Sequence, residues 1–302
     1  MERIGCSIIY IQSEKLERMM SMKKNKYLFK VYYIGKKKYY GSQRQRDFLT
    51  IEGCLLEALN EKEYINKAEN LGLEFASRTD RFVSARGACF ACNSEKKPIL
   101  MEINSLLPKE IGIWACAKVP LDFSTRYNAI MRHYVYIVPI PLSHLRNTTN
   151  MDVKLMQQAC KQLEGRHDFV NFSKKEKDDI NTIRNMDSVT LSISNNYLFF
   201  HFKSKAFLRQ QVRRMVKKVM ELGINEISYD DFLEIFDSSK VFSYQPADPK
   251  GLILWDIKFD DNVKFEEDPK SKERMNVFFQ EKEFYCGLKH QLFRTLQQYN
   301  FS

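Results

Sequence analysis

Short apolar and polar segments alternate along the first part of the chain and predict strands separated by helices. YLFKVYYIG, which starts at Tyr27, has the β-branched and aromatic content of a strand. TIEGCLLEALNE follows with one apolar face, and Thr50 stands where a helix N-cap is expected. INSLLPKEIGIWACAKV then predicts a loop or short helix and a strand that ends near Val119.

A similar succession starts near Asp122. We predict a strand from Arg132 to Ile140 and a hairpin that turns at Asn195 and Asn196. The other elements predicted here are an amphipathic helix MDVKLMQQACKQLEG that closes at Gly165, a long helix AFLRQQVRRMVKKVMELG ended by Gly223, a short helix from about Tyr229 to Phe236, and a final strand GLILWDIKF. Both parts therefore predict α+β units of similar plan with a groove between them.

The stretch from Leu73 to Phe90 interrupts the apolar pattern with a charged group, Ser77-Arg78-Thr79-Asp80, between two short strand-like segments. An arginine two residues before an aspartate can hold the carboxylate ionised in a partly buried cleft, as a catalytic aspartate requires. The alternative is a turn capped by Asp80, with Arg78 as its surface partner.

Length and charge narrow the class of protein. The 302 residues suggest about two domains, and the formal charge of +10 indicates a polyanionic partner. No apolar run approaches the roughly 18 residues of a membrane span, which favours nucleic acid over a membrane. Seven cysteines without a secretory leader predict reduced thiols in a cytoplasmic protein. Cys89 and Cys92 form the only close pair, which strand alternation explains better than zinc, so no metal is expected.

Cations gather on the predicted long helix opposite its apolar stripe. Other basic residues near predicted turns and strand ends add further positive charge, and together these cations could bind along a phosphate backbone. A solvated helix face is the plain alternative. The candidate RNA-binding residues are Lys36, Lys37, Lys38, Arg44, Arg46, Lys203, Lys205, Arg209, Arg214 and Lys217. Tyr134 and Tyr136 on one strand, like Tyr39 and Tyr40, offer rings for stacking or for the core.

Six motifs in a fixed order resemble the tRNA pseudouridine synthase A family of the archaeal or eukaryotic type. They are YYGSQRQ with TIEGCLLEAL, SRTDRFVSARG, FSTRYNAIMRHYVY, LEGRHDFVNFSK, FLRQQVRRMV and ADPKGLIL, and they span about residues 27–259. The resemblance implies an α+β fold of two ferredoxin-like halves, joined into one mixed, mainly antiparallel sheet with a basic cleft between them. It divides the chain into an N-terminal extension (1–25), two halves (26–121 and 122–260), and a charged linker with a C-terminal helix (261–302).

The resemblance also implies the activity and the site. The family isomerises uridine to pseudouridine in tRNA without cofactor or metal, normally as a homodimer, and the anticodon stem and loop is the expected target. Asp80 matches the essential aspartate, and Arg78 an arginine that pairs with it. Tyr134 matches the tyrosine that packs on the target base, and Arg213 an arginine that reaches the same pocket. Whether the aspartate acts as nucleophile or base is left open.

Three features depart from this pattern or lie beyond it. Phe82 replaces the family's usual glycine, and a bulky residue is strained there if the position needs a positive φ. His167 and Asp168 in GRHDF predict a structural turn rather than an acid–base pair. The C-terminal EKEFYCGLKHQLFRTLQQY predicts a helix, for which packing on the second half or on another subunit is favoured over RNA contact. The rival interpretations are a noncatalytic RNA-binding protein of the same fold and a synthase that acts at other tRNA positions.

Overall fold

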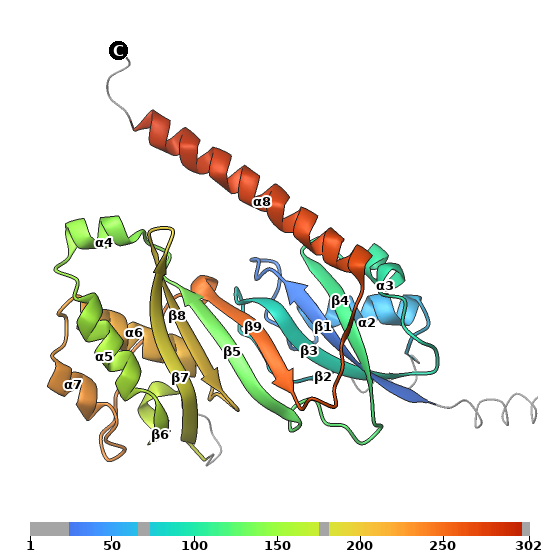
Figure 1. Ribbon diagram of the computed structural model, residues 1–302, viewed down its shortest axis with the longest axis horizontal. Coiled ribbons are helices and arrows are strands. Elements are labelled where there is room, and N and C mark those ends of the chain that lie inside the picture. The colour runs from blue at the N-terminus through green and yellow to red at the C-terminus, as the bar shows by residue number, and fades with distance from the viewer. Residues whose placement is uncertain (1–23, 66–72, 175–180, 298–302) are drawn as a thin grey trace, which may run out of the picture.

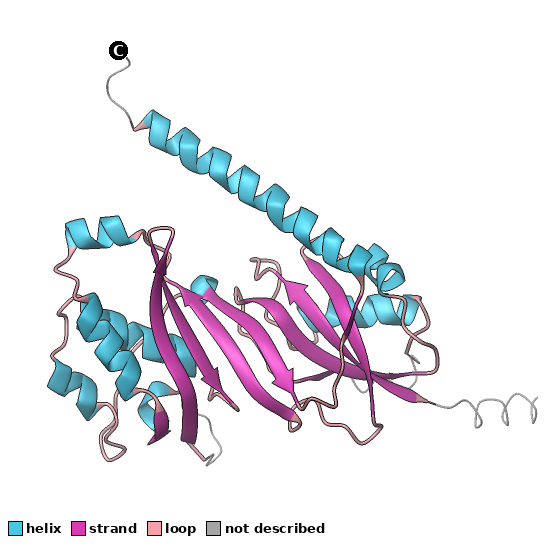
Figure 2. Cartoon of the chain, viewed as in Figure 1, coloured by secondary structure: helices cyan, strands magenta, loops and turns pink. Residues whose placement is uncertain are grey.

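The computed structural model describes residues 24–65, 73–174 and 181–297. Ten strands form one continuous sheet across the molecule, with helices α2 and α3 at one end and α4 to α7 at the other (Figures 1 and 2). The strand order is β10-β4-β1-β3-β9-β5-β8-β7-β6, and β2 pairs with β3. Most pairs are antiparallel, which confirms the predicted α+β class and the mixed, mainly antiparallel sheet.

The first half is a ferredoxin-like unit. Its elements are β1 (Asn25–Tyr33), α2 (Ile51–Glu61), β2 (Glu74–Phe75), β3 (Ser84–Ser94), α3 (Leu100–Leu106) and β4 (Ile111–Val119). The first and third strands lie at the centre, the fourth beside the first and the second beside the third, as in a split βαβ unit. The Thr50 hydroxyl accepts a hydrogen bond from the Gly53 amide at 3.1 Å, so the predicted N-cap of α2 is confirmed.

The second half repeats this arrangement. Its elements are β5 (Ala129–Ile137), α4 (Leu142–Thr148), α5 (Val153–Gln162), β6 (Gly165–Asp168), the 3-10 turn η2 (Val170–Phe172), β7 (Ile183–Ser194), β8 (Tyr197–Ser204), α6 (Gln211–Gly223), α7 (Tyr229–Glu234), the 3-10 turn η3 (Pro249–Gly251) and β9 (Leu252–Phe259). The hairpin between β7 and β8 turns at Asn195 and Asn196, both left-handed, as predicted.

The two halves join along a short parallel ladder between β3 and β9. Its register pairs Ser84 with Ile253 and Ala85 with Leu254. Gly87 lies beside this ladder, and a Cβ there would come within 2.9 Å of the Trp255 carbonyl oxygen. The close approach explains the glycine, and it brings the loop before β3 next to the second half.

Several predicted boundaries need correction. The strand predicted from Arg132 to Ile140 runs three residues earlier, and the long helix begins only at Gln211, because Gln210 is left-handed (φ 60°). Helix α5 ends before Gly165, which starts β6 with φ +89°. The turn predicted at GRHDF is therefore wrong, since these residues pair with β7 as a strand. Residues 1–23, part of the charged loop (175–180) and Tyr299 lie outside the described residues.

Helix α8 (Pro269–Leu296) begins inside the segment predicted as a linker, after the short strand β10 (Glu266–Glu267). Met275 and Phe278 pack with Tyr32 and Trp114 of the first half, in a small cluster separate from the main core. The rest of α8 projects away from the sheet (Figure 1). Packing on the second half, one of the two alternatives predicted for this helix, is wrong, because its buried turns contact the first half and its C-terminal turns are exposed.

Candidate active site

A cleft of about 1100 Å³ opens where the two halves meet. The loop between β2 and β3 forms one wall, while β5 and the residues that lead into α6 form the other. Asp80, Arg78, Tyr134 and Arg213 all line it, so the four residues that the resemblance points to lie together. Loops that sit on a sheet edge between two units are a usual place for a ligand site.

Hydrogen bonds from the first half hold the loop that carries Asp80. The Thr79 hydroxyl lies 2.8 Å from the Tyr33 hydroxyl, and the Thr79 amide donates to Ser42 Oγ at 2.8 Å. Ser42 returns a backbone bond to the Thr79 carbonyl at 3.1 Å. Gly41 has φ +92°, and a Cβ there would approach the Thr79 oxygen to 2.9 Å. Buried side chains thus fix the backbone beside Asp80, which favours a single orientation of its carboxylate.

Phe82 closes this loop in a left-handed conformation, with φ 70°. The expectation that a bulky residue at this position is strained is therefore confirmed. A Cβ on Gly35 would lie 2.2 Å from the Phe82 carbonyl carbon, so the two segments touch backbone to backbone. Two cations flank the Phe82 ring, Arg81 at 5.0 Å and Lys250 at 5.7 Å, and these contacts offset part of the strain.

Asp80 forms an ion pair with Arg213 across the two halves. Arg213 Nη1 donates to Asp80 Oδ2 at 2.9 Å, and Arg213 Nε donates to the Ala247 carbonyl at 2.7 Å. The Arg213 side chain is buried, whereas Asp80 keeps 39% of its side-chain surface. No described residue donates to Oδ1 of Asp80. A rigid guanidinium thus orients a part-exposed carboxylate that lines the cleft, an arrangement suited to a nucleophile or a general base.

Arg78 does not take the predicted role. Its side chain is exposed at the cleft, and within the described part of the chain it forms no ion pair with Asp80. The predicted pairing of Arg78 with Asp80 is wrong, because alternate residues of an irregular loop need not point the same way. Arg213 alone supplies the guanidinium among the described residues.

Tyr134 forms part of the cleft wall. Its ring is 6% exposed and meets the edge of Phe207 at 5.1 Å between ring centres. Its hydroxyl lies 2.9 Å from Ser77 Oγ. Burial raises the pKa of the Tyr134 phenol above its ordinary value, so the group stays protonated at neutral pH. A neutral, oriented phenol can pack on a base and donate a hydrogen bond.

Arg132 is a site residue that sequence reasoning missed. It is 5% exposed and donates through Nη2 to the carbonyls of Ala76 at 2.7 Å and Arg126 at 2.9 Å. Its Nη1 donates to the carbonyl of Lys205. One side chain thus ties three backbone segments around the cleft. The sequence did contain an indication of this role, because Arg132 stands two residues before Tyr134 in a strand whose other residues on that face are predicted to be buried.

The predicted RNA-binding residues fall into two groups. Some are tied to the protein: Lys36 and Lys38 pair with Glu110 at 3.2 and 2.8 Å, Lys217 pairs with Glu221 at 3.1 Å, and Arg214 stacks on Tyr244. Exposed members are Lys37, Arg44, Arg46, Lys205 and Arg209, and Lys203 is half-buried. Arg209 lines the cleft, as do Arg81, Arg126 and Arg184, which were not predicted. The cationic character of the cleft itself therefore comes mainly from arginines of the loops and strand ends.

Glu110 organises the basic turn beside the site. Burial opposes its ionisation, but hydrogen bonds from Lys38, its own backbone and Lys36 prevail and lower its pKa to about 2. Tyr39 also donates to this carboxylate at 3.2 Å. Lys36 and Lys38 therefore serve the fold of this turn first.

His167 and Asp168 have structural contacts, as predicted, although within a strand. The Asp168 carboxylate accepts from Thr182 Oγ1 at 2.6 Å and from the Val170 amide at 3.0 Å. His167 Nε2 lies 2.7 Å from the Glu164 carbonyl, and its ring packs on Phe236 at 5.0 Å. Neither residue lines the cleft.

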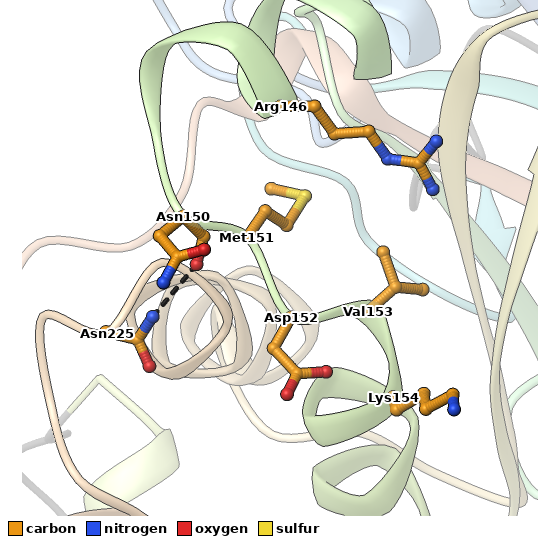
Figure 3. A pocket seen from close by; sticks show the side chains of 7 residues that line it. All are labelled: Arg146, Asn150, Met151, Asp152, Val153, Lys154 and Asn225. Atoms are coloured by element: carbon orange, nitrogen blue, oxygen red, sulfur yellow. Dashed lines mark hydrogen bonds between the residues drawn. The ribbon is translucent and has the colours of Figure 1, made fainter.

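A second pocket, of about 420 Å³, lies where the segment between α4 and α5 meets the end of α6 (Figure 3). Asn225 Nδ2 donates to the Asn150 carbonyl at 2.9 Å, which closes one side. Asp152 caps α5 by accepting from the Leu155 amide at 2.9 Å. Because the Asp152 carboxylate caps α5, it is already used by the helix. We therefore interpret this pocket as a junction between structural elements and not as a ligand site.

Metal-binding and membrane-spanning features are absent from the described residues. These residues hold no group of three or more His, Cys, Asp or Glu side chains placed to bind a metal ion. They also contain no helix whose length and apolar content would let it cross a membrane. Cys89 and Cys92 lie in β3, both buried, and burial raises the pKa of each thiol to about 12.

Comparisons with known proteins identify the family of the chain. A family described as tRNA pseudouridine synthase matches residues 159–260. Among curated relatives, tRNA pseudouridine synthase A of Methanothermobacter thermautotrophicus is 34% identical over 80% of this chain and 84% of its own. The proteins of that name from Archaeoglobus fulgidus and Pyrococcus furiosus are 33% and 34% identical, over 92% and 79% of this chain and 99% and 85% of theirs. The two ferredoxin-like halves with a carboxylate cleft define a pseudouridine synthase fold. The chain belongs to the tRNA pseudouridine synthase A family.

Proposed function

We propose that this protein isomerises uridine to pseudouridine in tRNA, with Asp80 as the catalytic residue and the anticodon stem and loop as its target. The observation that carries the proposal is the ion pair between Arg213 and the part-exposed carboxylate of Asp80, which lines the cleft. Family membership supports the reaction and the class of substrate. The target within tRNA rests on the resemblance alone.

The reaction replaces the bond from ribose carbon 1′ to base nitrogen 1 with a bond from carbon 1′ to base carbon 5. Carbon 5 loses a proton and nitrogen 1 gains one, so atoms and electrons balance within the substrate. Asp80 either attacks the sugar or the base, or removes a proton from the sugar. In both mechanisms the carboxylate must stay ionised and oriented, which is the role we assign to Arg213.

The base has to leave its stack to reach Asp80. Tyr134, whose ring already packs on Phe207, is placed to pack on the extruded base. Arg78 lines the same cleft and forms no ion pair with a carboxylate of the described residues, so a backbone phosphate beside the flipped nucleotide is its fitting partner. The exposed cations Lys205 and Arg209 extend this phosphate path. A homodimer in the cytoplasm that holds one tRNA across both subunits completes the proposal.

Release of tritium from carbon-5-labelled uridine in tRNA tests the activity. We expect turnover by the wild-type protein, and loss of turnover with little change in tRNA affinity for Asp80→Asn. Asp122→Asn, an exposed aspartate outside the cleft, is the matched control and should turn over normally. Turnover retained by Asp80→Asn would remove Asp80 from the mechanism.

A noncatalytic RNA-binding protein is the second candidate, and the strained Phe82 beside the catalytic loop is the feature that favours it. The same assay separates the two. Wild-type protein that binds tRNA and releases no tritium would establish the binding function and refute the enzyme.

A further inference from the structure

Tyr127 is the most exposed aromatic side chain among the described residues that line the cleft. It is 76% exposed, whereas Tyr134 in the same cleft is 6% exposed. A single exposed aromatic ring on an outer surface is ordinary and needs no explanation. This ring, however, stands inside the cleft in which the RNA of the proposed function has to lie.

The turn that carries Tyr127 is held by hydrogen bonds from both sides. The Ser124 hydroxyl donates to the Glu74 carboxylate at 2.8 Å, and the Ser124 amide donates to Asn128 Oδ1 at 2.8 Å. The Asn128 amide donates back to the Ser124 carbonyl at 2.9 Å, and Thr125 between them is fully buried. The backbone under Tyr127 is therefore ordered before any ligand binds, so that placing the ring against a ligand costs little entropy.

Guanidinium groups accompany the ring. The guanidinium of Arg126 lies 5.7 Å from the centre of the Tyr127 ring, and the side chain of Arg126 is exposed at the cleft. The Arg126 carbonyl accepts from the buried Arg132 at 2.9 Å, which ties this turn to β5. Proteins bind unpaired nucleotides with this combination, in which a ring stacks on the base and cations bind the phosphates.

Tyr127 and the reacting centre lie toward different ends of this wall. Ala129, two residues after Tyr127, begins β5, and the strand rises about 17 Å from Ala129 to Tyr134, whose hydroxyl bonds to the loop of Asp80. Bases in one strand stack only about 3.4 Å apart. A base on Tyr127 is therefore not the base that reaches Asp80, but belongs to a nucleotide further along the RNA.

We infer that Tyr127 and Arg126 form a second nucleotide site, in which an unpaired base of the RNA stacks on the Tyr127 ring and Arg126 binds an adjoining phosphate. The inference rests on the proposed function for its class of ligand, RNA, and not for the chemistry of Asp80. It makes Tyr127 a determinant of specificity. An RNA with an unpaired base at the right distance from the target uridine contacts both sites, whereas a continuous duplex has no free base to offer Tyr127.

An RNA stem–loop with the sequence of an anticodon arm tests the site, with 2-aminopurine placed in turn at each unpaired position. Stacking on an aromatic ring quenches the fluorescence of this base. We expect wild-type protein to quench one position on binding, and Tyr127→Ala to lose this quenching and to bind about tenfold more weakly. Tyr127→Phe keeps the ring and should retain both. A fully paired RNA of the same length should bind wild-type protein and Tyr127→Ala equally.

Tyr285→Ala is the matched control. Tyr285 is also an exposed tyrosine with a cation beside its ring, Lys289 at 4.6 Å, but it lies on α8 outside the cleft. Its substitution should change neither the quenching nor the affinity. In the tritium assay with the stem–loop, Tyr127→Ala should raise KM about tenfold and leave kcat within about twofold, which is the opposite division from Asp80→Asn.

Three results would overturn the inference. The first is Tyr127→Ala that quenches and binds like wild-type protein. The second is an equal loss of affinity for the fully paired RNA, which would make Tyr127 a backbone contact. The third is Tyr127→Phe as defective as Tyr127→Ala, which would assign the effect to the hydroxyl.

Tritium release separates this inference from the proposed function. Wild-type protein that quenches through Tyr127 and releases no tritium refutes the enzyme alone. Normal turnover with binding that does not depend on Tyr127 refutes the second nucleotide site alone.

Discussion

Arg132 offers the sharpest test of how the fold holds the site. Its guanidinium is buried and donates to carbonyls of Ala76, Arg126 and Lys205, which belong to three separate segments around the cleft. Arg132→Met keeps the stem of the side chain and removes every donor. Three carbonyls then lose a charged partner, each worth about 1–3 kcal/mol when left unsatisfied. Water from the adjacent cleft can replace some of the lost hydrogen bonds, so we expect the free energy of unfolding to fall by about 3 kcal/mol.

The same substitution should slow turnover. The Ala76 carbonyl anchors the loop that leads to Asp80, and a displacement of about 1 Å in a reacting group can cost 100-fold in rate. We expect kcat to fall about 10- to 100-fold, with little change in the KM for tRNA, because the Arg132 guanidinium is buried and its donors are used by protein carbonyls. Arg132→Lys, which keeps the charge and a single donor group, should recover part of both losses.

Urea unfolding followed by tryptophan fluorescence, together with tritium release, measures both effects. Arg166→Met, an exposed arginine outside the cleft, is the control and should change neither quantity. An Arg132→Met protein with wild-type stability and wild-type kcat would refute the clamp. A stability loss without a rate loss would show that Arg132 supports the fold but does not position Asp80.

Three further predictions concern the loop, the basic turn and the phosphate path. Gly41→Ala should lower the free energy of unfolding by more than about 1 kcal/mol and reduce kcat, because φ is +92° and the new Cβ meets the Thr79 oxygen. Glu110→Gln should cost about 2 kcal/mol at pH 7 in urea unfolding, allowing for half-exposed lysine partners. Since the pKa of Glu110 falls from 4.5 to about 2 on folding, this difference is present above about pH 5 and disappears as the pH falls toward 2. Lys205→Ala with Arg209→Ala should reduce the slope of the logarithm of the tRNA binding constant against the logarithm of salt concentration by about one for each residue.

Each of these has a matched control. For Gly41→Ala the control is Gly287→Ala, at an open helix position, which should stabilise the protein slightly. For Glu110→Gln the control is Glu95→Gln, on an exposed turn, which should leave the free energy of unfolding at low pH unchanged. For the cation pair the control is Lys217→Ala, which should barely alter the salt dependence of tRNA binding because Lys217 is already paired with Glu221. A tolerated Gly41→Ala, a pH-independent effect of Glu110→Gln, or an unchanged slope after loss of both cations would contradict the corresponding prediction.

Local chemistry made much of the fold predictable from the sequence. Thr50 before an apolar face and Asn195-Asn196 between two alternating runs act within a few residues, and the structure confirms both. The start of α6 was beyond such reasoning, because the apolar pattern continues through Phe207 while left-handed Gln210 ends the loop. Contacts distant in sequence were harder still. Arg132 reaches the Ala76 carbonyl 56 residues away and the Lys205 carbonyl 73 residues away, and no local pattern records such a bond.

The site residues also show that local patterns do not predict contacts between residues distant in sequence. The resemblance pointed to Asp80 and Arg213, which lie 133 residues apart and meet as an ion pair. Sequence proximity suggested Arg78 as the partner of Asp80, and this prediction was wrong, because residues two apart in an irregular loop need not point to the same side. Glu110, which holds the basic turn, gave no local signal because its two partners, Lys36 and Lys38, lie 74 and 72 residues earlier in the chain.

The narrow ladder between β3 and β9 links the integrity of the site to the docking of the two halves. Asp80 belongs to one half and Arg213 to the other, and only two residue pairs of the described sheet join those halves strand to strand. Mild denaturation that loosens this seam would separate the acid from its counter-ion while each half keeps its own helices and strands. Enzymatic activity should therefore vanish at lower urea than far-ultraviolet ellipticity does, which makes catalysis the more sensitive gauge of interdomain docking.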